Sequence, residues 1–377
     1  MNSFPDDDLV GLDDGAVRRV LMTASCSDAD ELPKVAGAGE VFEVDGARMQ
    51  RMHNGLVIEE GSYYGPMMTA IIRRLRGHHE PQEEVVIDAI IRRLKGELAD
   101  RADTDPSAPV SVLEFGSFWS YYSMWFCAAI EQARAVAMEP DPAYLAVGKR
   151  HAEANDLADR ITFFSGAIGD RPGEELEFVA ESDGLSYPVP MYDLQTLMAA
   201  AGVSRADVVL VDVQGAESIL LERAKPEFAA GAVRFMVVST HHQVISGQAI
   251  THQRALELLI DAGAHVIAEH TVGESYSGDG LIAVSFDPRD ADFVVNVSHA
   301  RYKDSLFGEV EYELETALAR ADAAENDSQH AHRHIAQLDS RIEQLEAENR
   351  ALAEQAARGS NSRARQRLGR LMSKRTS

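Results

Sequence analysis

Short apolar runs alternate with helical stretches between residues 110 and 287, and this alternation restricts the fold more than any other feature of the chain. Most of the runs are almost wholly apolar, as expected of strands buried on both faces, and they span residues 111–115, 135–139, 161–164, 208–213, 235–239, 266–269 and 281–286. Helical patterns lie between them at residues 122–132, 144–155, 194–201, 218–223 and 252–262. This order predicts an α/β fold with a Rossmann-like, doubly wound sheet of seven strands. The last two strands have no helix between them, so we expect an antiparallel closing pair.

Further regions flank this sheet domain, which we expect to span residues 101–305. Residues 1–100 are expected to form an N-terminal α+β cap, with strand-like pieces at 41–44 and 56–59 and helices at 67–75 and 82–98. Residues 308–358 are predicted to form a coiled-coil helix. Residues 359–377 are predicted to be a basic, disordered tail, because such a composition cannot bury a core.

The predicted coiled coil carries an unbroken heptad register from Leu314. Alanines weaken its first half, whereas residues 335–352 place mainly β-branched residues at position a and leucine at position d. This pattern favours a parallel homodimer through residues 314–356, with a buried Asn349 fixing register and strand number. A single amphipathic helix packed on the core is the alternative.

Charge and cysteine content restrict the partners and the compartment. The net charge of −25 disfavours a nucleic-acid surface, because phosphates would be repelled. The basic C-terminal stretch is the exception, and it offers a weak contact with an anionic membrane surface or an acidic partner. Cys26 and Cys127 are too few for a disulfide framework, and no signal peptide or membrane-spanning apolar run is evident. We therefore expect a cytoplasmic protein, with peripheral membrane attachment as an option.

The ends of the first three expected strands predict a ligand site. The first ends in Glu114, Gly116 and Ser117, the second ends in Glu139, and Ala167 and Ile168 follow the third. In a doubly wound sheet these ends meet at the carboxyl edge, where nucleotide-like ligands bind. Glu139 suits a ribose diol, since a carboxylate accepts hydrogen bonds from both hydroxyls. The alternatives are a plain structural turn at Gly116, a helix N-terminal acid at Glu139 and a surface turn at residues 165–170.

The residues after Gly116 distinguish between two cofactors. A dinucleotide site would have a further glycine at the helix start to cradle the diphosphate. Here Ser117 is followed by Phe118 and Trp119, whose bulk would crowd a diphosphate. S-adenosylmethionine has no phosphate and needs no such cradle. The sequence therefore favours S-adenosylmethionine over NAD.

With these motifs the chain resembles the FkbM family of class I methyltransferases, over about residues 80–287. The resemblance rests on Leu-Glu-Phe-Gly at 113–116 with Ser-Tyr-Tyr-Ser at 120–123, Glu-Pro at 139–140, Gly-Ala-Ile-Gly at 166–169, Asp193, and the block Asp-Val-Val-Leu-Val-Asp-Val-Gln-Gly-Ala-Glu at 207–217. It implies a class I methyltransferase domain and O-methyl transfer, often to sugar hydroxyls of glycans or tailored natural products. Three residues depart from the family pattern: Ser120 replaces a glycine, Leu210 a lysine and Gln214 a glutamate.

Methyl transfer to a hydroxyl needs a base, and the candidates follow the fourth and fifth strands. We expect His241 or His242 to be the general base, with a hydrogen-bonded structural histidine as the alternative. Asp212 is expected to bind the cofactor, orient the base, contact the acceptor or hold a divalent cation, unless it is a helix N-cap. No tight metal-ligand motif is present, so no metal is predicted.

The expected partner is a sugar-containing acceptor, either a small molecule or a glycan. Residues 52–55, 63–65 and 78–83 of the cap are expected to cover the cofactor and shape the acceptor pocket. Two other functions stay open. One is a non-catalytic, methyltransferase-like scaffold dimerised by its coiled coil, which the substitutions at Ser120 and Gln214 would suit. The other is an NAD-dependent oxidoreductase.

Overall fold

The chain forms two compact units, residues 1–308 and residues 309–377. The computed structural model describes residues 6–100, 109–299, 314, 316–342 and 344–345. In the second unit the described residues are helical and their large apolar side chains are exposed, namely Leu314, Leu318, Ile335, Leu338, Ile342 and Leu345. Dimerisation through this helix stays a prediction. The rest of the predicted coiled coil and the basic tail at 359–377 lie outside the described residues.

The first unit is built on the predicted seven-stranded sheet. Its strand order is β12-β13-β11-β10-β4-β5-β6, with all neighbours parallel except β13, which is antiparallel to both β11 and β12. The strands are β4 (Val110–Phe115), β5 (Ala133–Glu139), β6 (Ile161–Ser165), β10 (Ala206–Val211), β11 (Val233–Thr240), β12 (His265–His270) and β13 (Gly280–Ser285). The Rossmann-like fold and the antiparallel closing pair are confirmed.

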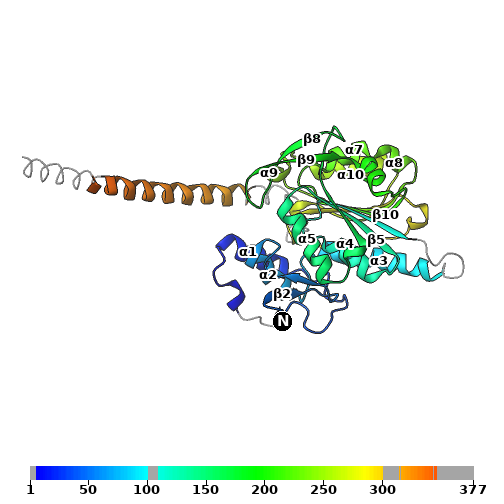
Figure 1. Ribbon diagram of the computed structural model, residues 1–377, viewed down its shortest axis with the longest axis horizontal. Coiled ribbons are helices and arrows are strands. Elements are labelled where there is room, and N and C mark those ends of the chain that lie inside the picture. Colours follow the sequence, from blue (N-terminus) through cyan, green and yellow to red (C-terminus); the bar gives the residue numbers. More distant parts are fainter. Residues whose placement is uncertain (1–5, 101–108, 300–313, 315, 343, 346–377) are drawn as a thin grey trace, which may run out of the picture. The chain divides into compact units, whose positions relative to one another are not determined.

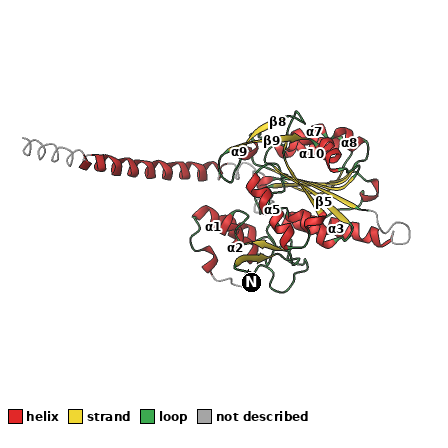
Figure 2. Ribbon diagram, viewed as in Figure 1, coloured by secondary structure: helices red, strands yellow, loops and turns green. Residues whose placement is uncertain are grey.

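Helices cover both faces of this sheet (Figures 1 and 2). One face packs against α3 (Pro81–Asp100), α4 (Tyr121–Ala129) and α5 (Pro142–Ala154). The other packs against α6 (Leu194–Ala201), α7 (Glu217–Arg223), α8 (Lys225–Ala229) and α10 (Thr251–Asp261). Strands such as β11 are buried along their whole length, because apolar helices lie on both sides. None of the helices in the described ranges has both the length and the apolar character to cross a membrane.

One predicted helix, 122–132, is too long at its C-terminal end. The structure ends α4 at Ala129, and Ile130 has an extended backbone. The carbonyl oxygen of Ile130 accepts a hydrogen bond of 2.5 Å from Arg160 Nη2, so it is satisfied outside the helix. The chain can then enter β5 at Ala133.

The N-terminal part packs into the same core as the sheet. It contains η1 (Asp6–Leu9), α1 (Asp14–Ala24), the antiparallel strands β1 (Val41–Val44), β2 (Ala47–Arg51) and β3 (Val57–Glu59), and α2 (Gly65–Arg74). Met52, Ile58 and Ile71 are almost fully buried in one cluster with Trp125 of α4. The helix α1 and strand β2 were not predicted. The cap is thus joined to the sheet domain by a shared apolar core.

A second unpredicted element follows β6. It is a small sheet of order β7-β9-β8, made of β7 (Ala167–Ile168), β8 (Glu175–Val179) and β9 (Ser186–Tyr192). Pro188 and Pro190 interrupt the strand signal of β9 in the sequence, since proline lacks the N–H that a ladder needs. Register places Ala167 opposite Met191 and so holds the turn after β6 at the carboxyl edge.

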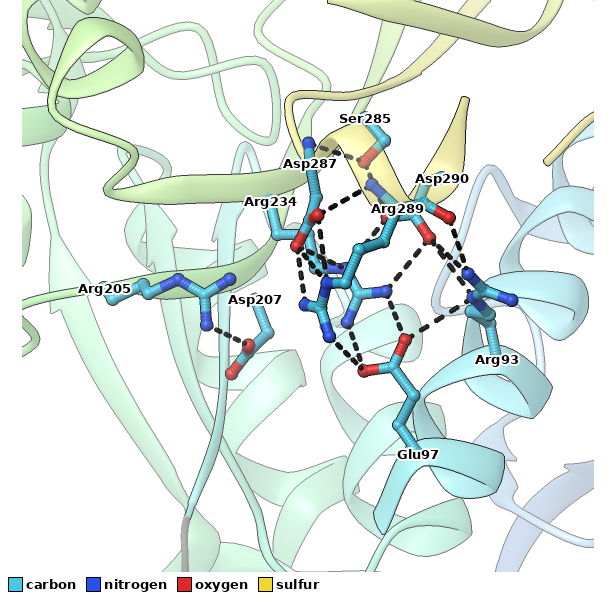
Figure 3. Close-up of polar contacts among 9 residues, drawn as sticks. All are labelled: Arg93, Glu97, Arg205, Asp207, Arg234, Ser285, Asp287, Arg289 and Asp290. Carbon is cyan, nitrogen blue, oxygen red and sulfur yellow. Dashed lines mark hydrogen bonds and ion pairs between the residues drawn. The ribbon is translucent and has the colours of Figure 1, made fainter. Parts of the chain in front are cut away.

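A buried ion-pair network ties α3 to the amino edge of the sheet (Figure 3). Arg234, at the start of β11, donates hydrogen bonds of 3.0 Å from both Nε and Nη2 to Asp290, and one of 2.7 Å from Nη1 to Glu97 of α3. Arg93 Nε donates to Asp290 at 3.1 Å. Arg234 and Asp290 are almost fully buried, so this cluster is satisfied by internal partners rather than by water.

Candidate functional site

A cavity of about 430 Å³ lies at the carboxyl ends of β4, β5, β10 and β11. All seven predicted cofactor residues line it, namely Glu114, Gly116, Ser117, Glu139, Ala167, Ile168 and Asp212. They come from four different strand ends, as expected at the switch region of a doubly wound sheet. The aromatic lining residues are Tyr63, Tyr64, Phe115, Phe118, Trp119, Tyr122, Tyr144 and Phe178. The sequence motifs therefore converge on one hollow.

Gly116 is a glycine because a neighbouring loop leaves no space for a side chain. Its φ is +75°, in the left-handed region, and an added Cβ would lie 1.6 Å from the carbonyl oxygen of Asp212. The two loops are also joined by a hydrogen bond of 2.9 Å from Asp212 N to Phe115 O. The expectation that Gly116 serves close approach to a ligand is thus incomplete, because close approach to the β10 loop already requires it.

Glu139 ends β5 with its carboxylate held in place from two sides. Its Oε2 accepts a hydrogen bond from Phe118 N at 2.8 Å, and its Oε1 accepts one from Asp141 N at 2.9 Å. Burial raises the pKa of Glu139 to about 8, against the effect of these two amides. Each oxygen keeps a lone pair for a ligand, so the group is oriented and still able to accept a hydroxyl.

Glu114 is the last residue but one of β4 and pairs with Ala137 of β5. Its Oε2 accepts a hydrogen bond from Ser123 N, in the first turn of α4, at 3.1 Å. Burial raises the pKa of this carboxyl group to about 7. Ser117 is buried and lines the same cavity, and its Oγ has no hydrogen-bond partner among the described residues. The cavity floor thus offers an unused hydroxyl as well as two pre-oriented carboxyl groups.

The geometry does not favour His241 as a general base. Its Nδ1 lies 2.7 Å from Glu217 Oε1, and its Nε2 lies 3.1 Å from Asp212 Oδ1. Burial opposes protonation, but hydrogen bonds to Asp212 and Glu217 outweigh it and raise the pKa of His241 well above the usual value. A protonated imidazole has no lone pair to receive a proton. His241 is also not among the residues that line the cavity.

His242 is likewise placed for a structural role. It is the N-cap of the short helix α9 (Gln243–Ser246), where its Nδ1 accepts a hydrogen bond of 3.2 Å from Val244 N. It does not line the cavity. The sequence did not predict α9, and so gave no sign that His242 would cap a helix.

Asp212 is the predicted catalytic residue that does reach the cavity. Its side chain is 48% exposed and is anchored by His241. The alternative reading as an N-cap is wrong, because α7 begins at Glu217 with Ala216 as its cap residue and no side-chain cap. Glu217 contacts His241, and His241 in turn contacts Asp212, so these two side chains hold the carboxylate of Asp212 in place.

Two of the departures from the FkbM pattern lie at positions of unusual backbone conformation. Ser120 has a φ of +59° and Gln214 a φ of +48°, both in the left-handed region. Glycine occupies that region at no steric cost, whereas other residues adopt it rarely. Gln214 Nε2 donates to Tyr64 Oη at 3.4 Å, so this side chain links the β10 loop to the N-terminal part. Leu210, the third departure, lines the cavity as an apolar side chain.

The N-terminal part completes the cavity with residues for which the sequence predicted no individual role. His79, Glu80 and Glu83, from the start of α3, line it together with Tyr63 and Tyr64. The expectation that the cap shapes this site agrees with the placement of these five residues, whereas residues 52–55, which it also included, do not line the cavity. The histidine-acid cluster was a visible signal in the sequence, but its alignment with the sheet edge depends on how α3 packs.

Acidic side chains predominate in the cavity lining, and His79 is the cationic exception among the described residues. The carboxyl groups of the lining are Glu80, Glu83, Glu114, Glu139, Asp141, Glu181 and Asp212. No lysine or arginine occurs among the described residues that line it. Such a lining repels phosphates and attracts cations.

The nearest set of potential metal-binding side chains is His53, His78 and Glu84, with ligand atoms within 4.8 Å of one another. These residues do not line the cavity. Glu84 already pairs with His78 and His79, and its Oε1 accepts a hydrogen bond of 2.9 Å from His79 N. We interpret this cluster as support for the first turn of α3.

The sequence matches no protein-family model and no curated protein. Among solved structures, the chain is similar to the N-terminal domain of human METTL16 in complex with SAH, at 14% identity and a TM-score of 0.35, over 55% of this chain and 71% of that one. It is also similar to precorrin-6y C5,15-methyltransferase from Geobacter metallireducens, at 14% identity and a TM-score of 0.32, over 53% of this chain and 86% of that one. A third similar structure is TrmK from M. capricolum with S-adenosyl-homocysteine, at 13% identity and a TM-score of 0.30, over 53% of this chain and 74% of that one. The second is a methyltransferase by name, and the first and third were solved with S-adenosylhomocysteine bound, but TM-scores this low leave the chemistry of this chain to be inferred from its own cavity.

Proposed function

We propose that this chain is an S-adenosylmethionine-dependent methyltransferase. The observation that carries the proposal is the convergence of Gly116, Glu139 and Ala167 on one cavity whose charged lining is mainly acidic. A sulfonium cofactor with a free ammonium group suits this acidic lining, whereas the diphosphate of NAD would find no lysine or arginine among the described residues that line the cavity. The absence of a second glycine after Gly116 points the same way.

The residues present fit this cofactor. Glu139 would receive the ribose hydroxyls, and the small Ala167 and the apolar Ile168 would contact the adenine. Glu114 and Ser117 supply a carboxyl group and an unpartnered hydroxyl at the floor of the cavity. When bound, the cofactor supplies an electrophilic methyl group to an acceptor.

The acceptor in this proposal is a hydroxyl of a saccharide, glycan or glycosylated natural product. The FkbM-like motifs support O-methyl transfer, and the cavity adds aromatic walls and carboxyl groups able to bind hydroxyls. Tyr63 and Trp119 stack on each other with ring centroids 4.4 Å apart and an interplanar angle of 6°, forming a rigid apolar wall. Asp212, anchored by His241, faces the same space and helps to orient the acceptor.

Calorimetric titration with S-adenosylhomocysteine and with NAD tests the cofactor assignment. We expect S-adenosylhomocysteine to bind and NAD not to bind. Glu139→Gln should weaken S-adenosylhomocysteine binding about tenfold, because glutamine replaces one of the two oxygens that would accept the ribose hydroxyls by an NH₂ group, and one lost hydrogen bond of about 1.4 kcal/mol is a tenfold loss of affinity. Glu131→Gln is the matched control, since Glu131 is exposed just before β5 and lies outside the cavity.

Each outcome of the titration has a clear meaning. Binding of NAD alone would favour an oxidoreductase. Binding of neither ligand would favour a non-catalytic scaffold. Either of these two results would overturn the proposal. Equal affinity of Glu139→Gln and the wild type would remove Glu139 from the cofactor site.

A further inference from the structure

Two carboxyl groups enter the cavity from the start of α3 rather than from a strand of the sheet. Glu80 directly precedes α3, and Glu83 lies in its first turn, three residues later. Both line the cavity together with Tyr122 of α4 and Ser239 of β11. Residues three apart on a helical turn lie on one face, so the two carboxyl groups are neighbours.

Glu80 is held as a carboxylate with one oxygen left for a ligand. Tyr122 Oη donates a hydrogen bond to its Oε2 at 2.9 Å, and His79 Nε2 lies 3.4 Å from the same oxygen. Both contacts fall on Oε2, and no contact of Oε1 is found among the described residues. Burial alone would raise the pKa of Glu80, but the charge of His79 outweighs it and lowers that pKa. The pKa of His79 is itself raised to about 10, because Glu80 and Glu84 outweigh its own burial.

Glu83 is held in the opposite protonation state. Ser239 Oγ donates a hydrogen bond to its Oε2 at 2.9 Å. Burial, and after it the negative charges of Glu80 and Asp212, raise the pKa of Glu83 well above the usual value, against the opposing effect of His79. A neutral Glu83 therefore carries one O–H donor beside the carboxylate of Glu80.

We propose that Glu80 and Glu83 form the acceptor site of this methyltransferase, with Glu80 as the general base for the acceptor hydroxyl and Glu83 as the hydrogen-bond donor that holds the acceptor. This inference rests on the proposed function. It goes beyond it by assigning the chemistry to the start of α3 rather than to the histidines after β11. Neighbouring carboxyl groups with opposite protonation states are a recurring arrangement for acid–base work.

The step balances with S-adenosylmethionine as the methyl donor. The acceptor oxygen forms a bond to the methyl carbon, the carbon–sulfur bond breaks, and its electron pair goes to sulfur, giving a neutral thioether. The hydroxyl proton passes to Glu80 Oε1. Glu80 is better shielded from water for this step than Asp212, because the side chain of Glu80 is 15% exposed and that of Asp212 is 48% exposed.

The protonation of Glu83 can be measured without turnover. We propose infrared spectra of the full-length protein, free of cofactor, for wild type, Glu83→Gln, Glu80→Gln and the double variant, at a series of pH values. Glu114 and Glu139 contribute to the same carboxylic-acid band, so the difference between wild type and Glu83→Gln isolates Glu83. We expect this difference to contain a protonated carboxyl group at pH 7.

The coupling between the two acids gives a second signature. The difference between Glu80→Gln and the double variant reports Glu83 without the charge of Glu80. Its titration should move to lower pH, because the negative charge of Glu80 raises the pKa of Glu83. The proposal would be overturned if Glu83 were ionised at pH 7, or if the pH at which it titrates were the same with and without Glu80→Gln.

Binding and kinetics separate this inference from the cofactor assignment. Titration with S-adenosylhomocysteine should give the same affinity for wild type, Glu80→Gln, Glu83→Gln and the exposed control Glu153→Gln. With the hexose that the wild type methylates best, Glu80→Gln should lower kcat by about 10²–10⁴ and Glu83→Gln should mainly raise KM. Loss of S-adenosylhomocysteine binding in the wild type would refute the proposed function. Intact binding with unchanged kcat in Glu80→Gln would refute this inference alone.

Discussion

Replacing Asp290 by asparagine should destabilise the fold while leaving the cavity intact. Asp290 is fully buried and accepts two hydrogen bonds from Arg234, one from Arg93 and one of 2.8 Å from Ser285 (Figure 3). Asparagine has a similar shape, but it removes the charge and turns an NH₂ group toward guanidinium donors.

The expected cost follows from these contacts. At least two charge-assisted hydrogen bonds are lost, each worth about 1.5–3 kcal/mol, and Arg234 keeps only Glu97 as a close partner. We expect a loss of roughly 3–5 kcal/mol in the free energy of unfolding, the range seen when one member of a buried ion pair is removed. Because the network lies at the amino edge of the sheet, affinity for S-adenosylhomocysteine should not change.

Urea unfolding at pH 7 measures this loss from the shift in midpoint at constant slope. Asp207→Asn is the matched control, because Asp207 forms a single 3.3 Å ion pair with the partly exposed Arg205, and it should cost less than about 1 kcal/mol. A difference between Asp290→Asn and the wild type below about 1 kcal/mol would refute the reasoning, because it would mean that the buried charge contributes no more than a surface pair.

The pH dependence gives an independent check. Burial opposes ionisation of Asp290, but hydrogen bonds from Arg234 and Ser285 outweigh it and hold its pKa below the ordinary value of 3.8. A lowered carboxyl pKa contributes stability that is fully present above the unfolded value and is lost as pH falls through the folded value. The difference in the free energy of unfolding between wild type and Asp290→Asn should therefore stay constant from neutral pH down to the ordinary aspartate pKa of 3.8, and should become smaller only in stronger acid.

Two further predictions concern Gly116 and the C-terminal helix. Gly116→Ala places a Cβ 1.6 Å from a carbonyl oxygen at φ +75°, so urea unfolding should show a loss of roughly 3 kcal/mol in the free energy of unfolding. The control Gly202→Ala has a similar φ of +70° but no atom within 4 Å of the added Cβ, and should lose only about 1 kcal/mol. Equal losses would contradict the explanation by close approach. Removing residues 308–377 should give a monomer by light scattering that still binds S-adenosylhomocysteine, and a deletion variant with the oligomeric state of the full chain would exclude dimerisation through this helix.

The local pattern of the chain was sufficient to predict the sheet and its ligand edge. Apolar runs of strand length alternating with helices specify parallel strands, and the carboxyl ends of such strands meet at one edge. That geometry brought Gly116, Glu139 and Ala167 to one cavity, as predicted. The small sheet β7-β9-β8 was missed because two prolines in β9 hide its strand pattern.

The protonation states and the acceptor half of the cavity depended on the tertiary structure. From the sequence alone, His241 is an ordinary base candidate, because Glu217 and Asp212, which keep it protonated, are 24 and 29 residues away in the chain. Glu80 and Glu83 lie well over 100 residues before Asp212, and only the packing of α3 brings them to the same cavity. The sequence determined where the strands and their ends lie, because those depend on local periodicity. The fold decided which side chains hold charge and face the ligand, because burial and Coulomb interactions depend on distance in space rather than along the chain.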